Sequence, residues 1–448
     1  MRVLFGTDGI RGKAHQYPLD GATMFALGEA LGHRLRTAVN KPRVLLGMDT
    51  RQSGPEIARA LTAGVAAGGG IANLIGVIPT PGVAHLCRTT DALAAISISA
   101  SHNPFGDNGV KIFGHDGMKL PDSVEEQIED ELRAIRRDSV TIPDDPLPES
   151  KELVEKYERF LVSGVQRNAL AGRKVVLDAG YGAAYRIGPD VFRRAGAEVV
   201  VIHDKPNGRN INEHSGAMHP ERLAAVVVQQ VADFGVAFDG DADRAIFVDD
   251  SGKIRDGDEI IYLWAQHLNR LGKLQSGAVV TTVMSNFGLE RQLKSDGIEL
   301  LRAQVGDKYV LELMLEKKVL LGGEQSGHII DLTVHTTGDG IHTALVFGEI
   351  LSGLPKKFSQ LRTFEPMPQL LLNQRVGSKP PLESLKRYRR AEEKAREDLG
   401  ARGRILVRYS GTENLVRVMV EGEDEAQIKR IAEEVRDVLR DEIDSVSA

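Results

Sequence analysis

The sequence predicts a multidomain α/β protein that ends in a smaller α+β domain. The chain has 448 residues, well beyond the size at which one hydrophobic core keeps growing, so three or four domains are expected. Helix-like and strand-like apolar patterns alternate through most of the chain, which is typical of α/β domains. The pattern changes after Leu354-Pro355, where the expected order becomes strand, charged helix, two strands and helix.

The first domain is expected at residues 1–150. Its expected elements are strands at residues 44–48, 72–78 and 93–98 and a helix at residues 55–67. Residues 60–87 carry no Asp, Glu, Lys or Arg, but they are rich in Gly and Ala and contain Pro79 and Pro81. This composition favours a buried helix, strand and turn over a membrane span. A Pro- and Asp-rich break at residues 143–148 precedes the boundary.

Two further α/β domains are expected at residues 151–253 and 254–365. An amphipathic stretch at residues 151–165 opens the second domain. The other expected elements are buried strands at residues 174–177, 197–202, 235–238, 278–283 and 319–322 and helices that begin at Asn286 and Asp307. Residues 44–49 resemble residues 175–180 in pattern, which is consistent with a repeated fold.

The C-terminal domain is expected at residues 366–448. Its helices are expected at residues 381–399 and 424–441, and two strands at residues 404–407 and 415–420 lie between them. A charged helix followed by paired strands differs from the alternation before it, so this domain is expected to be α+β.

Composition excludes several classes of partner. The chain is 42% apolar and 27% charged, with a formal net charge of −6. Such a balance gives no general attraction for nucleic acid or an acidic membrane surface, so a small anionic substrate held by local Arg and Lys clusters is expected instead. The single cysteine, Cys87, cannot form an internal disulfide, and Asp8 and Arg11 interrupt any signal peptide. A cytoplasmic protein is therefore expected.

The run Ser99-Ala100-Ser101-His102-Asn103-Pro104 presents a hydroxyl on a tight turn after small apolar residues. A serine hydroxyl is a weak nucleophile by itself, and Lys111 is a candidate cationic partner. The alternative is an ordinary turn, because Asn-Pro and Asn-Gly are common turn signals. His102 and His328 lack metal-ligand spacing, and an isolated histidine is more often structural than catalytic.

Asp239, Asp241 and Asp243 are spaced so that a looped backbone lets three carboxylates meet at one hard cation. Magnesium suits this ligand set. An EF-hand is excluded because Arg244 stands at the sixth position, where that loop needs glycine, and because both flanks are strand-like. The apolar flanks also disfavour a solvated acidic turn, since three buried carboxylates repel one another without a cation.

Two more polar clusters are candidate binding loops. Arg408, Ser410, Gly411, Thr412 and Arg417 supply donors suited to a phosphate monoester, although a hairpin with exposed arginines has the same pattern. A polar run at residues 323–328 follows a buried strand, and its Glu324 and Ser326 are candidate ligands for sugar hydroxyls. A plain turn between two strands is the alternative there.

These clusters and the run Phe5-Gly6-Thr7-Asp8-Gly9-Ile10-Arg11-Gly12 stand in the order found in the α-D-phosphohexomutases. The sequence resembles this family over essentially its whole length, most closely the bacterial members that act on glucosamine phosphate. The resemblance implies three similar mixed α/β domains and a C-terminal TATA-binding-protein-like domain, arranged around a central cleft.

The resemblance also implies roles for single residues. Ser101 carries a phosphate in the active enzyme, and Mg²⁺ held by the three aspartates also touches that phosphate, so Ser101 is counted among the metal ligands. Arg11, Lys111 and His102 are the other expected catalytic residues. The residues expected to bind substrate are Arg244, Lys308, Glu324, Ser326, His328, Arg408, Ser410, Gly411, Thr412 and Arg417.

The implied reaction converts glucosamine 6-phosphate to glucosamine 1-phosphate. It passes through a phosphoserine enzyme and glucosamine 1,6-bisphosphate, which serves as intermediate and activator, and its product feeds UDP-N-acetylglucosamine synthesis. Conversion of mannose or glucose phosphates is the nearest alternative. A serine-dependent metallophosphatase and a non-catalytic sugar-phosphate sensor are alternatives from other classes. A homodimer is a candidate assembly.

Overall fold

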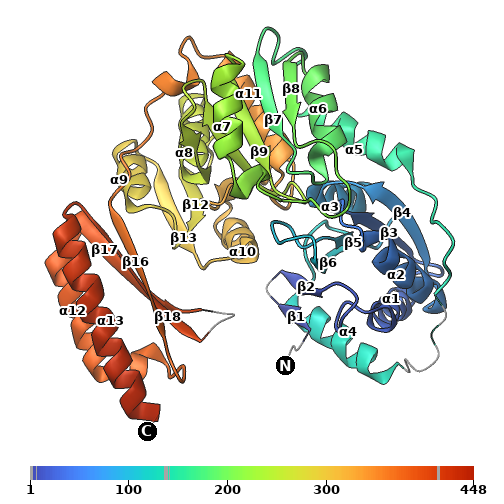
Figure 1. Ribbon diagram of the computed structural model, residues 1–448, viewed down its shortest axis with the longest axis horizontal. Helices are drawn as coiled ribbons and strands as arrows, with labels where there is room; N and C mark the ends of the chain where they lie inside the picture. Colours follow the sequence, from blue (N-terminus) through green and yellow to red (C-terminus); the bar gives the residue numbers. More distant parts are fainter. Residues whose placement is uncertain (1–3, 7, 136–139, 141, 411–413, 448) are drawn as a thin grey trace. The chain divides into compact units, whose positions relative to one another are not determined.

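The computed structural model describes residues 4–6, 8–135, 140, 142–410 and 414–447. Four β-sheets with their helices follow one another along this part of the chain (Figure 1). The first three belong to mixed α/β domains and the fourth to a smaller α+β domain, so the predicted fold class is confirmed. The described helices contain no apolar stretch of the length that a transmembrane helix requires.

The first sheet has six strands in the order β1-β2-β6-β5-β3-β4. Its elements are β1 (Phe5–Gly6), β2 (Gly9–Lys13), α1 (Gly21–Arg36), β3 (Arg43–Met48), α2 (Gly54–Ala67), β4 (Ile71–Val77), α3 (Thr80–Thr89), β5 (Ala94–Ile98), β6 (Asp107–Gly114) and α4 (Asp122–Ala134). All residues of β5 and all but the first of β3 are buried, which explains their continuous apolar runs.

The segment after β4 differs from the sequence expectation. The chain forms helix α3 from Thr80 to Thr89, where the composition predicts a turn. Pro81 lies in the first turn of α3, and a helix tolerates proline there because the N–H that proline lacks has no partner within the helix. The two prolines therefore mark the start of a buried helix and not a connection between strands.

The second sheet has the order β11-β10-β9-β7-β8, and the third has the order β13-β12-β14-β15. The second domain contains α5 (Lys151–Ser163), β7 (Lys174–Asp178), α6 (Ala184–Arg194), β8 (Glu198–Ile202), α7 (Glu221–Gln229), β9 (Phe234–Phe238), β10 (Ala245–Asp249) and β11 (Ile254–Arg255). The third contains α8 (Gly257–Arg270), β12 (Ala278–Thr282), α9 (Phe287–Ser295), β13 (Glu299–Ala303), α10 (Asp307–Lys317), β14 (Leu321–Gly323), β15 (Ile329–Asp331) and α11 (Gly340–Ser352).

The three sheets share one arrangement of four strands. The matching orders are β6-β5-β3-β4, β10-β9-β7-β8 and β15-β14-β12-β13. In each sheet the fourth of these strands along the chain pairs antiparallel with the third. The resemblance between residues 44–49 and 175–180 has a structural basis, because β3 and β7 are the first strands of their repeats. The loop between the third and fourth strands therefore has the same place in all three domains.

The fourth sheet has the order β16-β18-β17 and is antiparallel throughout. Its elements are β16 (Gln369–Arg375), α12 (Lys386–Leu399), β17 (Gly403–Tyr409), β18 (Leu415–Gly422) and α13 (Glu425–Ser447). Single 3₁₀ turns occur at Gly216–Met218, Phe358–Gln360, Leu382–Ser384 and Gly400–Arg402.

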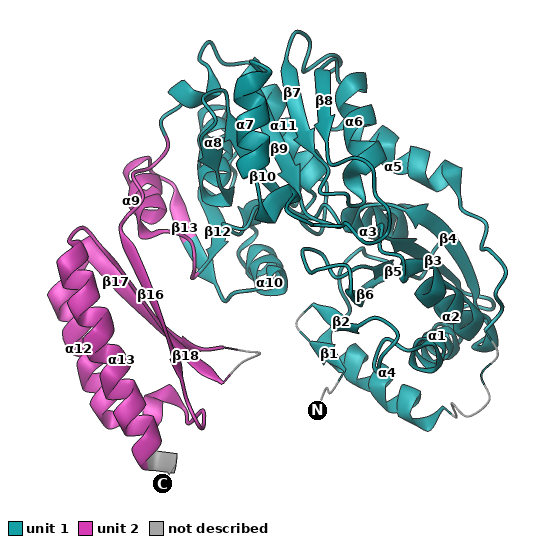
Figure 2. Cartoon of the chain, in the orientation of Figure 1, with its two compact units in different colours: residues 1–282, 301–362 teal, residues 283–300, 363–448 magenta. Residues whose placement is uncertain are grey.

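The chain divides into two compact units (Figure 2). One holds residues 1–282 and 301–362, and the other holds residues 283–300 and 363–448. Helix α9 therefore groups with the C-terminal domain. Within that unit the backbone N–H of Phe287 donates to Glu421 Oε1 (3.1 Å), which anchors the start of α9 to strand β18.

Candidate active site

Three loops of predicted site residues occupy the equivalent place in the repeated domains. They connect β5 to β6, β9 to β10 and β14 to β15, and all lie in the unit of residues 1–282 and 301–362. The first two loops touch through their backbones. A Cβ on Gly240 would lie 2.5 Å from the carbonyl oxygen of Ser101, so this approach requires glycine.

A buried arginine, Arg51, holds the backbone of the Ser101 loop. Its side chain is 1% exposed. Its guanidinium donates hydrogen bonds to four carbonyl oxygens of the loop, those of Ser101, Asn103, Pro104 and Asp107. Arg51 Nε also donates to Asp49 Oδ2 at 2.9 Å, and Asn212 Nδ2 donates to the Ser101 carbonyl at 2.9 Å. The loop is therefore fixed before any ligand binds.

Sequence reasoning missed Arg51 and Asn212. The available signal for Arg51 was its place in Asp49-Thr50-Arg51, a charged pair directly after the buried strand β3. In an α/β sheet, polar residues at the carboxyl end of a strand are good candidates for a site. Asn212 lies in a long connection without a comparable signal.

Ser101 stands at the tip of the loop with a backbone φ of 51°. Its hydroxyl donates to Asp239 Oδ2 at 2.6 Å, and His102 Nδ1 lies 3.3 Å from Ser101 Oγ. Burial, together with the charge of Arg244, lowers the pKa of His102 to about 4. The loop therefore presents the serine hydroxyl to an aspartate, beside an imidazole that is neutral at pH 7.

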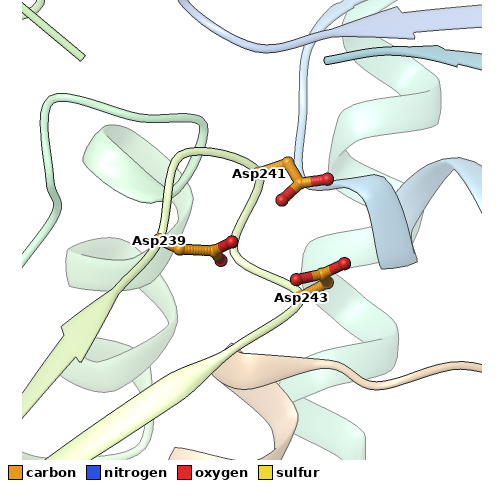
Figure 3. A group of neighbouring side chains, drawn as sticks. All are labelled: Asp239, Asp241 and Asp243. Atoms are coloured by element: carbon orange, nitrogen blue, oxygen red, sulfur yellow. The ribbon is translucent and has the colours of Figure 1, made fainter. Parts of the chain in front are cut away.

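The three aspartates of the β9–β10 loop converge (Figure 3). Asp239, Asp241 and Asp243 are buried, and one carboxylate oxygen from each lies within 4.8 Å of the others. Within the described residues, Asp241 Oδ1 and Asp243 Oδ1 are buried without a hydrogen-bond partner. Buried polar atoms are normally paired, so these oxygens fit a cation bound by oxygen ligands. The group could hold a metal ion.

Charge around the loop acts differently on its members. Burial raises the pKa of Asp239 well above its usual range, and the charges of Asp243 and Asp241 add to that effect. For Asp243, burial acts in the same direction, but Lys111, His328 and Arg244 together outweigh it and hold the pKa well below the usual range. A bound cation would favour the ionised form of Asp239 in the same way that Lys111 favours that of Asp243.

Lys111 lies in β6 and reaches the aspartate loop. Its Nζ is 3.2 Å from Asp241 Oδ2 and 3.3 Å from Asp243 Oδ2. Burial would lower the pKa of Lys111, but these carboxylates and Asp8 raise it well above its usual range. Lys111 is therefore a fixed positive charge beside the loop. Arg11 forms an ion pair with Asp8 and approaches the Ala100 carbonyl at 3.5 Å.

The β14–β15 loop is a turn between antiparallel strands. Ser326 Oγ donates to Glu324 Oε2 at 3.2 Å, and the backbone N–H of Gly306 donates to Glu324 Oε1 at 3.2 Å. His328 is buried, and its Nδ1 lies 3.7 Å from Asp243 Oδ2. The structure thus brings this loop to the aspartate loop.

Arg244 and Lys308, the two other predicted substrate-binding residues of this unit, have different surroundings. Arg244 follows the aspartates, and its Nη1 is 3.4 Å from His102 Nδ1, so it belongs to the same cluster. Lys308 forms an ion pair with Asp122 at the start of α4. The structure does not bring Lys308 into contact with Glu324, Ser326 or His328 through any described hydrogen bond.

The predicted phosphate-binding residues belong to the C-terminal unit. Arg408 and Arg417 are partners on the antiparallel strands β17 and β18 and are not part of the connecting loop. Burial and the charge of Arg417 lower the pKa of Arg408, an arrangement that an anion would relieve. Ser410 is buried, and its carbonyl accepts from Lys379 Nζ at 2.7 Å. Gly411 and Thr412 lie outside the described residues.

Four domain families match consecutive parts of the chain. They are the phosphoglucomutase/phosphomannomutase α/β/α domains I, II and III at residues 2–138, 153–252 and 256–367 and the phosphoglucomutase/phosphomannomutase C-terminal domain at residues 371–438. Together they cover most of the chain in the order of the family.

Curated relatives match over nearly full length. A phosphoglucosamine mutase of Solibacter usitatus is 47% identical over 444 residues, which is 98% of this chain and 99% of the relative. The phosphoglucosamine mutase of Koribacter versatilis is 46% identical, with 99% and 98% covered. That of Bdellovibrio bacteriovorus is 42% identical, with 98% of each chain covered.

Solved structures share the fold. A phosphoglucomutase/phosphomannomutase family protein from Burkholderia thailandensis superposes with a TM-score of 0.79 at 24% identity, covering 98% of both chains. An N-acetylphosphoglucosamine mutase of Aspergillus fumigatus, solved with GlcNAc-6P and magnesium, gives a TM-score of 0.60 at 17% identity, with 98% of this chain and 96% of that one covered. With the domain matches and the full-length relatives, these likenesses show that the chain belongs to the phosphoglucomutase/phosphomannomutase family, the α-D-phosphohexomutases.

Proposed function

We propose that this phosphohexomutase converts glucosamine 6-phosphate to glucosamine 1-phosphate, with Ser101 as the phosphorylated residue. The observation that carries the substrate is the 42–47% identity, over nearly the whole chain, to relatives named phosphoglucosamine mutase. The geometry supports the chemistry, because a serine on a rigid loop faces three carboxylates and a fixed lysine. The nearest alternative is a phosphomannomutase or phosphoglucomutase.

In the proposed reaction, phospho-Ser101 transfers its phosphoryl group to the O1 hydroxyl of the sugar. The bond between phosphorus and Ser101 Oγ breaks and a bond to O1 forms, while the O1 proton passes to a nearby base and Ser101 Oγ takes up a proton to become a hydroxyl again. Lys111 and Arg11 stabilise the negative charge on the transferring oxygens. The sugar 1,6-bisphosphate then turns around and returns its 6-phosphoryl group to Ser101, which leaves glucosamine 1-phosphate.

The three aspartates are proposed to hold Mg²⁺. When bound, this ion supplies Lewis-acid stabilisation of phosphoryl oxygens. Asp239, Asp241 and Asp243 are the protein ligands, and the two buried oxygens among them that lack a hydrogen-bond partner support this assignment. The buried Lys111 keeps Asp243 ionised and so ready to act as a ligand.

Sugar recognition is proposed for the β14–β15 loop, and phosphate recognition for the C-terminal domain. Glu324 and Ser326 are expected to bind ring hydroxyls, with Arg244 and His328 beside them. The residues proposed to hold the phosphate that does not react are Arg408, Ser410, Gly411, Thr412 and Arg417. Several hexose phosphates share the ring hydroxyls and the phosphate that these residues are proposed to bind. We therefore expect only a moderate preference for the amino sugar.

The test compares glucosamine, glucose and mannose 6-phosphates as substrates at matched bisphosphate concentration. We expect the highest kcat/KM with glucosamine 6-phosphate and measurable conversion of glucose 6-phosphate. A higher kcat/KM for mannose 6-phosphate would contradict the substrate assignment and leave the phosphoserine chemistry standing. Free phosphate is measured in the same assay, since a metallophosphatase would release it as fast as isomer forms, and a sensor would form neither.

Cellular location and assembly are also proposals. We propose a cytoplasmic enzyme, in line with its sugar-phosphate substrate, and a homodimer. Light scattering of the purified protein at several concentrations tests the second point, and a mass of 48.8 kDa at all concentrations would contradict it.

A further inference from the structure

Lys119 bridges two carboxylates that belong to different domains. It follows β6 in the first domain, and its side chain is 15% exposed. Its Nζ lies 2.5 Å from Asp8 Oδ1 in the first domain and 2.6 Å from Asp307 Oδ2 in the third. Both contacts lie within the same compact unit. A short ammonium bridge of this kind orders both of its partners.

The two carboxylates lead to different parts of the proposed active site. Asp8 pairs with Arg11 and lies 3.3 Å from Lys111 Nζ, so it touches both basic groups proposed to stabilise the transferring phosphoryl group. Asp307 is the first residue of α10, and Gly306 before it donates its N–H to Glu324. The bridge therefore connects the basic groups to the proposed sugar ligand.

Electrostatics keep this bridge ionised. Burial would raise the pKa of Asp8, but Lys111, Lys119 and Arg11 hold it well below its usual range. Burial and the charge of Asp8 would also raise the pKa of Asp307, but Lys119 and His328 together lower it. Removing one partner of an ion pair that is partly shielded from water leaves the other charge unpaired, which strongly destabilises the folded protein.

We infer that Lys119 is a positioning residue, which sets Glu324 at the correct distance from Arg11 and Lys111 through its simultaneous contacts with Asp307 and Asp8. The inference rests on the proposed function, because Glu324 is taken as the sugar ligand. Lys119 does not need to touch the sugar for this role. Its loss would leave each half of the site intact and would relax the distance between them.

A second ion pair joins the same two segments, with the lysine now on the α10 segment and the aspartate on the segment after β6. Lys308, next to Asp307, pairs with Asp122, three residues after Lys119. The Asp122 side chain is 54% exposed, so water screens this pair. The Lys119 bridge is the better shielded of the two contacts and touches Asp8 as well. We therefore assign the positioning role to Lys119.

The test uses Lys119→Met, which keeps an unbranched side chain of nearly the same length and removes its charge, and Lys119→Arg, which can still reach both carboxylates. We expect Lys119→Met to lower kcat about 10- to 100-fold, as displacement of a reacting group by about 1 Å does. The KM should change less than about threefold, since both binding halves persist. Lys119→Arg should restore most of kcat, which a merely structural contact would not require.

A matched control is Arg88→Met. Arg88 also reaches from the first domain to the third, where it donates to the Val334 carbonyl, and no described hydrogen bond or ion pair joins it to Asp8 or Asp307. We expect its kcat to equal that of the unaltered chain. Equal kcat losses in Arg88→Met and Lys119→Met would overturn the inference, because any contact between the two domains would then have the same effect.

Two measurements guard against misfolding and against a wrong substrate. The double variant Lys119→Met/Asp307→Asn also removes the negative charge of Asp307, which loses its Lys119 partner in Lys119→Met. The kcat of the double variant should match that of Lys119→Met, although its melting temperature should recover. Hydrogen exchange of residues 304–309 and 323–328 should rise in Lys119→Met. If the unaltered chain converts no hexose phosphate, the proposed function fails while the exchange result still decides the role of Lys119. Unchanged exchange and unchanged kcat overturn the inference.

Discussion

Two buried polar clusters lie between domains of the unit formed by residues 1–282 and 301–362, and they differ in the charge that their groups carry. One is the charged cluster of Lys111 and the three aspartates. The other, called here the histidine joint, consists of His85, Tyr157, Phe160, His335 and His342. The joint brings together α3, α5, α11 and the segment before α11. All members of the two clusters except the partly buried Phe160 are buried, so burial alone does not distinguish the clusters.

The histidine joint is stacked, and burial favours the neutral form of two of its histidines, His85 and His335. The rings of His85 and Phe160 lie 3.8 Å apart at 24°, and His335 meets Phe160 edge-on at 5.9 Å. Burial, together with Arg88, lowers the pKa of His85 to about 4. Burial also lowers the pKa of His335 well below its usual range. Ring packing around the uncharged imidazoles of His85 and His335 therefore holds this cluster together.

The charged cluster keeps the charges of Lys111 and Asp243 by compensation instead. Lys111 supports the ionised form of Asp243, and two carboxylate oxygens lack a hydrogen-bond partner among the described residues. A buried cluster that retains charge and has carboxylate oxygens without hydrogen bonds is suited to bind a cation, whereas a cluster whose groups become neutral on burial is suited to packing. The comparison teaches that the state of the buried groups, and not their number, separates a ligand site from a structural joint.

The largest effect should come from Ser101→Ala. Removing Oγ removes the phosphoryl acceptor and donor, so we expect turnover to fall by several orders of magnitude. Intact-mass measurement should find one phosphate on the unaltered protein and none on the variant. An active Ser101→Ala protein whose phosphate sits on another residue would break the comparison, because the charged cluster would then surround the wrong serine.

The second-largest effect should come from replacing Asp241, one of the proposed metal ligands. Asp241→Asn keeps the acceptor for Thr80 Oγ1, which lies 2.6 Å from Asp241 Oδ2, and removes one negative charge. We expect activity to fall about 100-fold or more and the Mg²⁺ titration to shift to higher concentration. In EDTA the variant should be at least as stable as the unaltered chain, because a repulsion is relieved. Full activity of the unaltered chain in EDTA would remove the metal from the proposed mechanism.

Arg51→Lys should have a smaller effect on activity and a clear effect on stability. Lysine cannot reproduce the planar fork that reaches four carbonyl oxygens and Asp49. We expect a loss of about 3 kcal/mol in the free energy of unfolding, typical of breaking a buried ion pair. We also expect kcat to fall about 10-fold through displacement of Ser101. Urea unfolding and assays on fully folded protein separate the two effects, and an unchanged kcat would contradict a positioning role for this arginine.

The sequence predicted the loops better than the contacts between them. The aspartate loop was predictable because apolar runs flank it and its spacing is local. The Ser101 loop was predictable because it ends the buried strand β5. In contrast, the contacts of Arg51 join residues about 50 positions apart, and those of Lys119 reach Asp8 and Asp307, so only tertiary packing reveals them.

Helix α3 shows the same limit within the fold. Pro79 and Pro81 are turn signals when they are read locally, but Thr80–Thr89 is buried through most of its length and forms a helix. Tertiary burial overrides the local signal, because a helix accepts proline in its first turn. The repeat of the first three domains was only indicated by residues 44–49 and 175–180, since strand order is a property of the folded sheet.

The smallest effect on catalysis should come from the histidine joint. The pKa of His85 is about 4 in the fold, against 6.5 for an exposed histidine, so the unfolded chain binds more protons between these pH values. The free energy of unfolding should therefore fall as pH falls from 6.5 to 4, by at most about 3 kcal/mol for this residue.

His85→Phe keeps a ring against Phe160 and cannot be protonated, so its unfolding free energy should depend less on pH. Replacing the exposed His33 by Asn is the control and should leave that dependence unchanged. Urea unfolding at pH 7.5, 6, 5 and 4.5 measures the slope. At pH 7.5 His85→Phe should retain kcat within about twofold, since no contact joins His85 to Ser101 or the aspartates among the described hydrogen bonds. A His85→Phe protein with the pH slope of the unaltered chain would show that the joint does not hold His85 neutral, and the contrast between the two clusters would fail.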